Sequence, residues 1–221
     1  GVKAPVRVVS CPSPRDALGR LARARHHTAN LNFPVIGITG TNGKTTITYL
    51  LEAFFSALGK RVGVMGTINY RWPGHEEPAP LTTPDCLTLH GNLARMREAG
   101  VEAAVMEVSS HSLDQQRVAG IDFSGAIFTN LTQDHLDYHA DMDDYFESKA
   151  KLFKTPYARR QAAAINADCA YGRELLARHR GALGFGLSPF KGKRPYLRGE
   201  ILSLTRHGLH LRMTCQGGSW E

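Results

Sequence analysis

The sequence predicts an α/β fold in which a mainly parallel sheet carries helices on both faces. Apolar runs of strand length alternate along the chain with longer segments of helical periodicity, as in strand–helix–strand units. A glycine-rich turn joins the first such run to the first long helical segment. The 221 residues are 42% hydrophobic and 21% charged, which is ordinary for a globular domain with a full core.

The first 32 residues are expected to form a short linker segment instead of a domain. A short basic helix is predicted from Arg15 to His27, and a loop through Asn30, Leu31 and Asn32 leads into the first strand. The predicted helix has three residues on one face: Leu18, Leu21 and Ala22. The prolines that punctuate the segment are Pro5, Pro12 and Pro14.

The segment from Gly40 to Thr46, Gly-Thr-Asn-Gly-Lys-Thr-Thr, is the strongest functional signal in the chain. The apolar run Val35–Ile38 before it reads as a buried strand. The segment after it has helical spacing up to Gly59, carried by Ile47, Leu50, Leu51, Phe54, Phe55 and Leu58. A turn between a strand and a helix start presents backbone N–H groups to a phosphate, with Lys44 for the terminal phosphates and the Thr45 hydroxyl for Mg²⁺. The spacing differs from the standard phosphate loop, which would place glycine where Ile38 stands.

The remaining elements follow the same alternation. Strands are predicted at 62–65, 103–108, 126–128 and 162–165. One helix is predicted to start with Thr83 as its cap and Pro84 in its first turn, and to end at Gly100. Another is predicted from Asp141 to Phe153, with Asp141 as its cap. Near the end, alternating residues from Gly199 to Thr214 around Arg206-His207-Gly208 predict an antiparallel hairpin.

Composition narrows the class of protein. No apolar run is long enough to span a membrane and no signal peptide is recognisable, so the expected location is the cytoplasm without membrane partners. Four cysteines without a C-x-x-C pair argue against a zinc site or a disulfide framework. The net charge of +7 is dispersed and lacks interleaved aromatic residues, so a nucleic-acid partner is not expected.

Two isolated polar residues lie near or after the carboxyl ends of predicted strands. Glu107 stands near the carboxyl end of an apolar strand, where a carboxylate must be paired or bind a metal, unless it lies at an edge and reaches solvent. His135 follows the 126–128 strand, and a lone histidine is more often structural than a ligand. The structural interpretation is also favoured for His111 and His139.

Several motifs in one order resemble the Mur ligase superfamily. They are the Gly40–Thr46 loop, Met106-Glu107-Val108-Ser109-Ser110-His111, Gln115-Gln116-Arg117-Val118 and the segment from Asn130 to His139. The resemblance is greatest to members that add a diamino acid to UDP-N-acetylmuramoyl-L-alanyl-D-glutamate, and it covers about Phe33 to Glu221. It implies an ATP-binding central domain at 33–221 that is incomplete, preceded at 1–32 by a remnant of a UDP-binding domain, with the C-terminal amino-acid-binding domain absent.

The resemblance also implies roles for particular residues. ATP would be bound by Gly40, Thr41, Asn42, Gly43, Lys44, Thr45, Thr46 and Asn166. Magnesium would be held by Thr45 and Glu107, and a second Mg²⁺ by His135 and by Lys149 in carbamylated form, although spacing alone makes Lys149 part of a solvated helix face. The muramoyl dipeptide would contact Thr82, Thr83, Ser109, Gln115 and Arg117. The adenine-side motif departs from the family at Cys169, which replaces an aspartate.

The implied reaction is ATP-dependent amide formation through an acyl phosphate, assisted by charge neutralisation at Lys44, Glu107, His135 and Lys149. The partners would be two small molecules, UDP-muramoyl dipeptide and a diamino acid, and the protein is expected to be a monomer. Two alternatives remain: a folylpolyglutamate synthetase-like ligase and a non-catalytic nucleotide-binding fragment. Whether the added residue is lysine or meso-diaminopimelate cannot be read from these residues, and we expect the 221-residue chain alone to be inactive.

Overall fold

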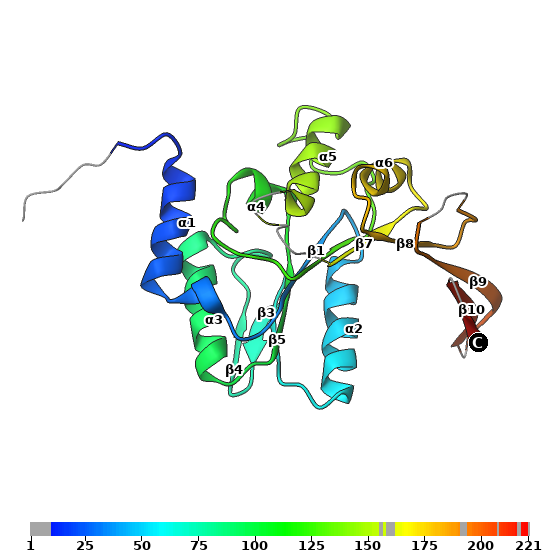
Figure 1. Cartoon of the computed structure of the whole chain (residues 1–221), viewed down its shortest axis with the longest axis horizontal. Helices are drawn as coiled ribbons and strands as arrows, with labels where there is room; N and C mark the ends of the chain where they lie inside the picture. Colours follow the sequence, from blue (N-terminus) through cyan, green and yellow to red (C-terminus); the bar gives the residue numbers. More distant parts are fainter. Residues whose placement is uncertain are drawn as a thin grey trace, which may run out of the picture.

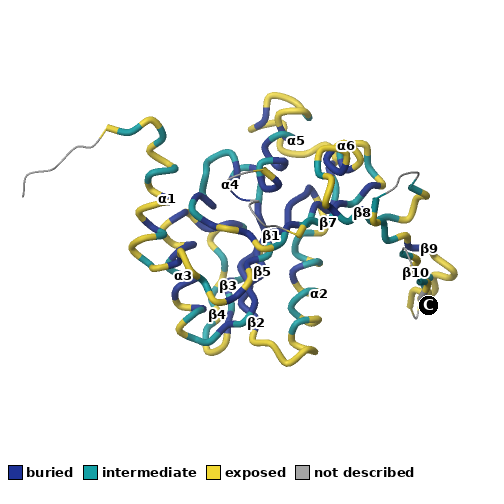
Figure 2. Tube along the Cα trace, viewed as in Figure 1, coloured by how far each residue is buried: buried dark blue, intermediate teal, exposed yellow. Residues whose placement is uncertain are grey.

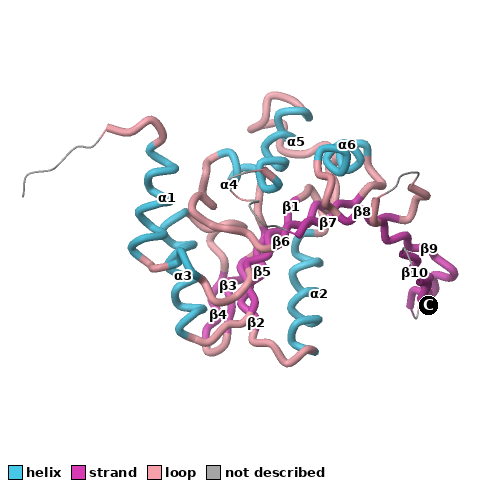
Figure 3. Tube along the Cα trace, in the orientation of Figure 1, coloured by secondary structure: helices cyan, strands magenta, loops and turns pink. Residues whose placement is uncertain are grey.

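The structure is a computed structural model that describes residues 10–154, 157, 162–190, 194–206, 208–215 and 218–220. Within these residues the strands form one sheet in the order β11-β10-β9-β8-β7-β6-β1-β5-β2-β3-β4. The pairings from β9 through to β2 are all parallel, and the strands beyond β9 and β2 pair antiparallel. The predicted mainly parallel sheet is therefore confirmed. Figure 3 shows its strands running through the molecule with helices on both sides.

The central strands are short and apolar, as their sequences require. They are β1 (Val35–Thr39), β2 (Val62–Met65), β5 (Ala103–Glu107), β6 (Gly125–Phe128), β7 (Ala162–Asn166) and β8 (Leu183–Gly186). The flanking strands are β3 (Asn69–Trp72), β4 (His75–Pro78), β9 (Tyr196–Thr205), β10 (Gly208–Cys215) and β11 (Gly218–Trp220). Predicted and observed bounds of the four shared inner strands and of the first strand differ by at most one residue.

The described helices cover the two faces of the sheet unequally. Helix α2 (Lys44–Ala57) packs alone on one face, over a small core of Ile38, Val62, Val64 and Val105 (Figure 1). The opposite face carries a much larger core, to which four helices contribute: α3 (Cys86–Glu98), α4 (Ser110–Asp114), α5 (Met142–Ala150) and α6 (Ala170–Arg178). Besides these helices and α1 (Pro14–Arg25), the described residues contain two 3₁₀ turns, η1 (Thr28–Asn30) and η2 (Lys151–Phe153).

The apolar repeat of α2 splits into two ridges. Ile47, Leu51 and Phe55 pack on the small core beneath the helix. Leu50, Phe54 and Leu58 are not part of this core and are about 60% exposed. Figure 2 shows the tube of α2 in the colours of partly buried and exposed residues. The apolar residues of α2 cover more of the helix surface than a single apolar stripe. The periodicity therefore predicted the helix, but it did not predict which of the two ridges is buried.

The N-terminal helix α1 (Pro14–Arg25) packs against α3. Its buried residues are Gly19 and Ala22, whereas Leu18 and Leu21 are exposed, so of the three residues predicted on one face only Ala22 is buried. The reason is a close approach: a Cβ on Gly19 would lie 2.5 Å from Ala119 Cβ, so the helix turns its smallest residues inward. The first nine residues, including Pro5, lie outside the described residues.

The start of α3 was also predicted wrongly. The cap is Asp85, whose carboxylate accepts hydrogen bonds from the N–H groups of Leu87 and Thr88. Thr83 lies outside the helix, where its hydroxyl donates to the Glu107 carbonyl. The prediction for α5 is confirmed: Asp141 accepts a hydrogen bond from Asp144 N at 2.8 Å, and the last predicted turn is the 3₁₀ turn η2.

The predicted C-terminal hairpin is present as β9 and β10, although His207 in its turn lies outside the described residues. Several elements were not predicted: the polar hairpin of β3 and β4, strand β8, and helices α4 and α6. Among the helices described, none has the length and apolar character needed to cross a membrane.

Candidate active site at the carboxyl edge of the sheet

The Gly40–Thr46 loop connects the carboxyl end of β1 to the N-terminus of α2. Gly40 and Gly43 have φ angles of 146° and 84°, which favour glycine. At Gly40 a side chain is also excluded by space, because a Cβ there would lie 1.9 Å from the Thr129 hydroxyl. No side chain caps the N-terminus of α2, which leaves the first N–H groups of the helix available to a bound anion.

The loop is held by the segment that follows β6. Thr41 N donates to the Asn130 carbonyl at 2.9 Å, and Asn42 N donates to Asn130 Oδ1 at 3.0 Å. In return, Asn130 Nδ2 and the Thr129 hydroxyl both donate to the Asn42 carbonyl. The loop is therefore positioned from the neighbouring parallel strand, which the sequence alone did not indicate.

Lys44 occupies the first position of α2 and folds back over the loop. Its amine donates to the carbonyls of Gly40 at 3.0 Å and Thr41 at 2.8 Å. Burial lowers the pKa of this amine, and the carboxylates of Glu107 and Asp134 oppose that shift. A partly buried cation beside a row of backbone donors is suited to bind a polyphosphate.

Glu107 is 1% exposed at the end of β5. Because side chains alternate along a strand, Glu107 lies on the same face as Val105, which is the face covered by α2. Its Oε1 accepts hydrogen bonds from the Thr45 hydroxyl and Thr67 N, both at 2.9 Å, and its Oε2 accepts from the Thr67 hydroxyl at 3.1 Å. The carboxylate is therefore an internal, paired group and not an edge carboxylate that reaches solvent.

Thr67 was missed by the sequence analysis. Besides both contacts to Glu107, its hydroxyl lies 3.1 Å from that of Thr82. Its neighbour Gly66 leaves room for the carboxylate, since a Cβ there would lie 2.4 Å from Glu107 Oε1. The useful signal was the Gly66-Thr67 pair directly after the predicted strand 62–65, at the same sheet edge as Glu107.

The residues assigned to the muramoyl dipeptide form one connected network beside Glu107. The Thr83 hydroxyl accepts from Ser109 N at 3.1 Å, and Arg117 donates to the Thr83 carbonyl at 3.4 Å. Arg117 also donates two hydrogen bonds to the side-chain oxygen of Gln115. Ser109 caps α4 through Ser112 N. The structure brings these residues together with Thr82; their contact with a substrate stays a prediction.

His135 lies in the same region through a cluster of aromatic rings. Its ring centroid is 5.0 Å from that of His111 and 5.8 Å from that of Tyr145, and its φ of 54° is in the left-handed region. Burial and the neighbouring histidines lower the pKa of His111. His139 is buried, with its ring nitrogens 3.1 Å from Asp144 Oδ2 and 3.0 Å from the Ser110 hydroxyl, which agrees with a structural role.

Lys149 is 1% exposed, so the interpretation as a solvated helix face does not hold for it. Its amine donates to the Gly40 carbonyl at 2.9 Å. Burial, together with the nearby cation of Lys44, places the pKa of this amine well below its ordinary value, against an opposing effect of Asp134. A lysine in such a setting carries a larger share of the neutral, nucleophilic amine.

Asn166 lies at the carboxyl end of β7, close behind the loop. Its amide donates to the Thr129 carbonyl at 2.7 Å and its oxygen accepts from Asp168 N at 2.9 Å. Cys169, where the resembled family has an aspartate, caps α6 by accepting from Gly172 N. The change therefore leaves a helix cap in place.

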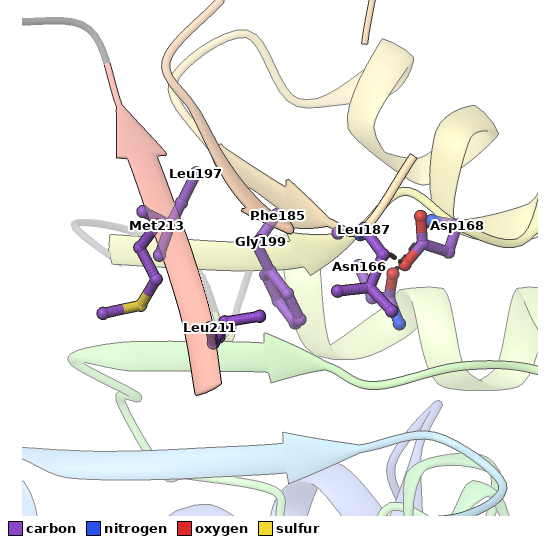
Figure 4. A pocket seen from close by; sticks show the side chains of 9 residues that line it. Asn166, Asp168, Phe185, Leu187, Leu197, Gly199, Leu211 and Met213 are labelled. Atoms are coloured by element: carbon purple, nitrogen blue, oxygen red, sulfur yellow. Dashed lines mark hydrogen bonds between the residues drawn. The ribbon is translucent and has the colours of Figure 1, made fainter. Parts of the chain in front are cut away.

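A pocket of about 360 Å³ adjoins Asn166 (Figure 4). Asn166 and Asp168 form its polar end, and Asp168 also accepts from the N–H groups of Leu187 and Ser188. The rest of the lining is mostly apolar and comes from β8, β9 and β10: Phe185, Leu197, Leu211 and Met213. A pocket with a polar end and an apolar wall suits a ligand with a flat apolar ring that carries polar atoms at its edge.

The donor atoms around Glu107 fit magnesium, because the Thr45 hydroxyl and the Glu107 carboxylate supply the oxygen ligands that Mg²⁺ prefers. The second metal site does not fit as it stands: Lys149 presents an amine to Gly40, and an amine of this kind is not an oxygen ligand. Among the described residues there is no cluster of three or more His, Cys, Asp or Glu side chains arranged to hold a metal.

Comparison with known proteins identifies the family. The family described as Mur ligase middle domain matches residues 38–220, so the chain belongs to the Mur ligase family. The UDP-N-acetylmuramoyl-L-alanyl-D-glutamate–2,6-diaminopimelate ligase of Lawsonia intracellularis is 55% identical over 212 residues, covering 94% of this chain and 43% of the relative. The chain thus spans less than half the length of this curated relative.

Solved structures agree with this assignment. A UDP-N-acetylmuramoyl-L-alanyl-D-glutamate–2,6-diaminopimelate ligase superposes with a TM-score of 0.79 at 29% identity, over 96% of this chain and 44% of the other. Mycobacterium tuberculosis folylpolyglutamate synthase, solved with ADP and AMPPCP, has a TM-score of 0.66 at 18% identity, over 94% and 53% of the two chains. The second likeness shows a shared fold alone.

Proposed function

We propose that this chain is the ATP-binding part of a ligase that adds a diamino acid to UDP-N-acetylmuramoyl-L-alanyl-D-glutamate in peptidoglycan precursor synthesis. The observation that carries the proposal is the uncapped start of α2, at which the Thr45 hydroxyl contacts the buried carboxylate of Glu107. The relatives that match over most of this chain are ligases named for the same reaction, which supports the proposal.

In this proposal the phosphates of ATP lie along the backbone of Gly40–Thr46. The Lys44 amine then donates its hydrogen bonds to phosphate oxygens in place of the two loop carbonyls that it contacts now. Asn166 and its adjoining pocket hold the base, since this pocket combines an amide edge with an apolar floor. Thr45 and Glu107 hold Mg²⁺, which neutralises phosphate charge when bound.

The remaining network positions the acceptor. The network is linked to Glu107 through the Thr83 hydroxyl and through Thr67, and it offers hydroxyl and guanidinium donors to the muramoyl dipeptide from Thr82, Thr83, Ser109, Gln115 and Arg117. The glutamyl carboxylate oxygen attacks the γ-phosphorus, the bond to the β-phosphate oxygen breaks, and ADP leaves. The amine then attacks the acyl carbon, loses a proton and expels phosphate from the tetrahedral intermediate.

Lys149 and His135 are proposed to hold a second Mg²⁺ only after Lys149 is carbamylated. The buried amine with its lowered pKa favours reaction with CO₂, and the resulting carbamate supplies oxygen ligands in place of a cation. Without that change the amine stays bonded to Gly40, and no step of the reaction is assigned to a second metal.

We propose 2,6-diaminopimelate as the incoming amino acid, because it is the residue named for the relatives that match this chain at 48 to 55% identity. We further propose that the protein is monomeric and cytoplasmic, with small molecules as its partners. In this view residues 1–32 lead out of a UDP-binding domain and residues 33–221 form the ATP-binding domain. A further domain would bind the incoming amino acid.

The test uses a hybrid in which this chain replaces the matching residues of the Lawsonia intracellularis ligase. With ATP, Mg²⁺, the UDP-muramoyl dipeptide and 2,6-diaminopimelate, we expect the tripeptide product by mass spectrometry. The matched control is the same hybrid carrying Lys44→Ala, which should form no product. A hybrid that instead ligates glutamate to a folate substrate would support the folylpolyglutamate synthetase-like alternative.

A further inference from the structure

Tyr145 is a fully buried residue of α5 that the proposed function leaves without a role. It stands one helical turn before Lys149, so the two side chains share a face of the helix. Its hydroxyl lies 3.2 Å from the hydroxyl of Thr41 in the phosphate loop. Tyr145 therefore connects α5 to the loop at Thr41, beside the contact that Lys149 makes with Gly40.

The direction of this hydrogen bond follows from the other partners of Thr41. The Thr41 hydroxyl donates its one proton to the Thr132 carbonyl at 3.2 Å and accepts from Thr132 N at 3.1 Å. A hydroxyl has one donor and two acceptor sites, so the contact with Tyr145 uses the remaining acceptor site. Tyr145 is the donor, and the Thr41 oxygen is fully satisfied. Burial raises the pKa of Tyr145, which keeps the phenol protonated.

The ring of Tyr145 contacts two residues assigned to the site, Lys149 and His135, and the structural residue His139. The Lys149 amine lies 4.4 Å from the ring centroid while it donates to the Gly40 carbonyl. The rings of His135 and His139 lie with their centroids 5.8 Å and 5.0 Å from it. The hydroxyl thus holds one side of the phosphate loop, and the ring supports the lysine that holds the other.

We infer that Tyr145 is a positioning residue that sets the conformation of the phosphate loop through Thr41 and orients Lys149 toward Gly40. The inference rests on the proposed function, because the loop must bind a nucleotide for its position to matter. Loss of the phenol frees one acceptor site on Thr41 and lets the loop sample other conformations, so that part of the binding free energy is used to order it.

The experiment measures the Kd for Mg-ATP by isothermal titration calorimetry on the 221-residue chain. Tyr145→Phe should raise the Kd about threefold to tenfold, the equivalent of one hydrogen bond. The control is Tyr171→Phe on α6, which also removes a tyrosine hydroxyl contact, here an exposed one to Asp143, without touching the loop. The control should leave the Kd within twofold of the wild type.

A double-mutant cycle separates positioning from general loosening. In a Thr41→Val background, which has no acceptor oxygen, Tyr145→Phe should change the Kd less than twofold. In a Thr41→Ser background, which restores the oxygen, the full effect should return. If Tyr145→Phe fails to fold by circular dichroism, Thr41→Val alone must show the same loss of affinity.

Two outcomes overturn the inference while leaving the proposed function intact. One is a wild-type Kd in Tyr145→Phe, and the other is an equal effect of Tyr145→Phe in the Thr41→Val and Thr41→Ser backgrounds. Absence of nucleotide binding by the wild-type chain overturns the proposed function, and the inference with it.

Discussion

The two helices that meet at the phosphate loop begin in opposite ways. Helix α5 starts with the carboxylate of Asp141 on Asp144 N and with two more acids in its first turn. Helix α2 starts with Gly43 in the left-handed region, without a side-chain cap and with the cation of Lys44 at its first position. Acidic side chains stabilise a helix at its N-terminus and cations destabilise it there. The start of α5 is therefore arranged for stability, and the start of α2 is not.

The two helix starts differ in how their backbone N–H groups find partners. At α5 the chain supplies the partner, and at α2 the N–H groups stay available to a ligand. The start of α5 needs nothing from outside, whereas the start of α2 becomes satisfied when an anion binds. The other described α-helices resemble α5, since each has a side-chain cap: Ser13 for α1, Asp85 for α3, Ser109 for α4 and Cys169 for α6.

The strongest test of the comparison is Lys44→Ala. We expect at least about a 100-fold loss of Mg-ATP affinity, because several charge-assisted hydrogen bonds are lost together. The free energy of unfolding should not fall, because a partly buried cation is removed from a helix N-terminus. Calorimetry and urea unfolding measure the two quantities. Lys60→Ala, a loss of an exposed lysine, serves as the control, and unchanged affinity in Lys44→Ala would contradict the loop assignment.

Glu107→Gln should come next in size. The amide places a donor group where the carboxylate now accepts three hydrogen bonds, and it removes the charge proposed to hold Mg²⁺. We expect roughly a tenfold or greater loss of nucleotide affinity in the presence of Mg²⁺, and a smaller loss in its absence. The control is Glu102→Gln, just before the same strand, at its other end. Equal losses with and without Mg²⁺ would argue against a metal-binding role.

Asp141→Ala should act on stability alone. Removal of the cap is expected to lower the free energy of unfolding by about 1 kcal/mol, since the N–H of Asp144 loses its partner. Nucleotide affinity should stay within twofold of the wild type. Urea unfolding measures the stability and calorimetry measures the nucleotide affinity, on the same preparation. A loss of binding free energy larger than the loss of unfolding free energy would remove the contrast between the two helices.

The last test concerns His90, another internally satisfied group, whose effect appears only as the pH falls. Its Nε2 is 3.0 Å from the Ala119 carbonyl and therefore carries the proton, while its Nδ1 is 2.5 Å from the Thr28 hydroxyl. Burial lowers the pKa of His90 below 6.5. The unfolded chain then binds more protons, so stability falls as the pH drops below 6.5, by at most about 1.4 kcal/mol per pH unit from this group.

Urea unfolding between pH 7.5 and pH 5 measures this slope. The variant His90→Gln should be less stable at pH 7.5 and should show a flatter pH dependence below 6.5. His27→Asn, at an exposed histidine, is the control and should keep the wild-type slope. The same slope in both variants would show that His90 does not titrate between the folded and unfolded states.

The central strands and α2 were predictable because each carries its signal within a few neighbouring residues. Apolar runs of four or five residues marked β1, β2, β5, β6 and β7, and the glycines marked the turn into α2. The hairpin of β3 and β4 lacks such a run, since His75–Pro78 is polar, and its pairing depends on β2 beside it. Elements that form through a neighbour leave little trace in their own sequence.

The phosphate loop and the sheet edge of Glu107 could be read from the sequence, because turn chemistry and strand parity are local, and the order of the motifs pointed to the family. The tertiary structure assigned the cap of α3 to Asp85, because the Thr83 hydroxyl is bonded to the Glu107 carbonyl and to Ser109 N across the sheet edge. It also decided that Lys149 is buried. The helix pattern permits an exposed lysine there, and only the packing of the Tyr145 ring and the Gly40 carbonyl around the amine removes it from water.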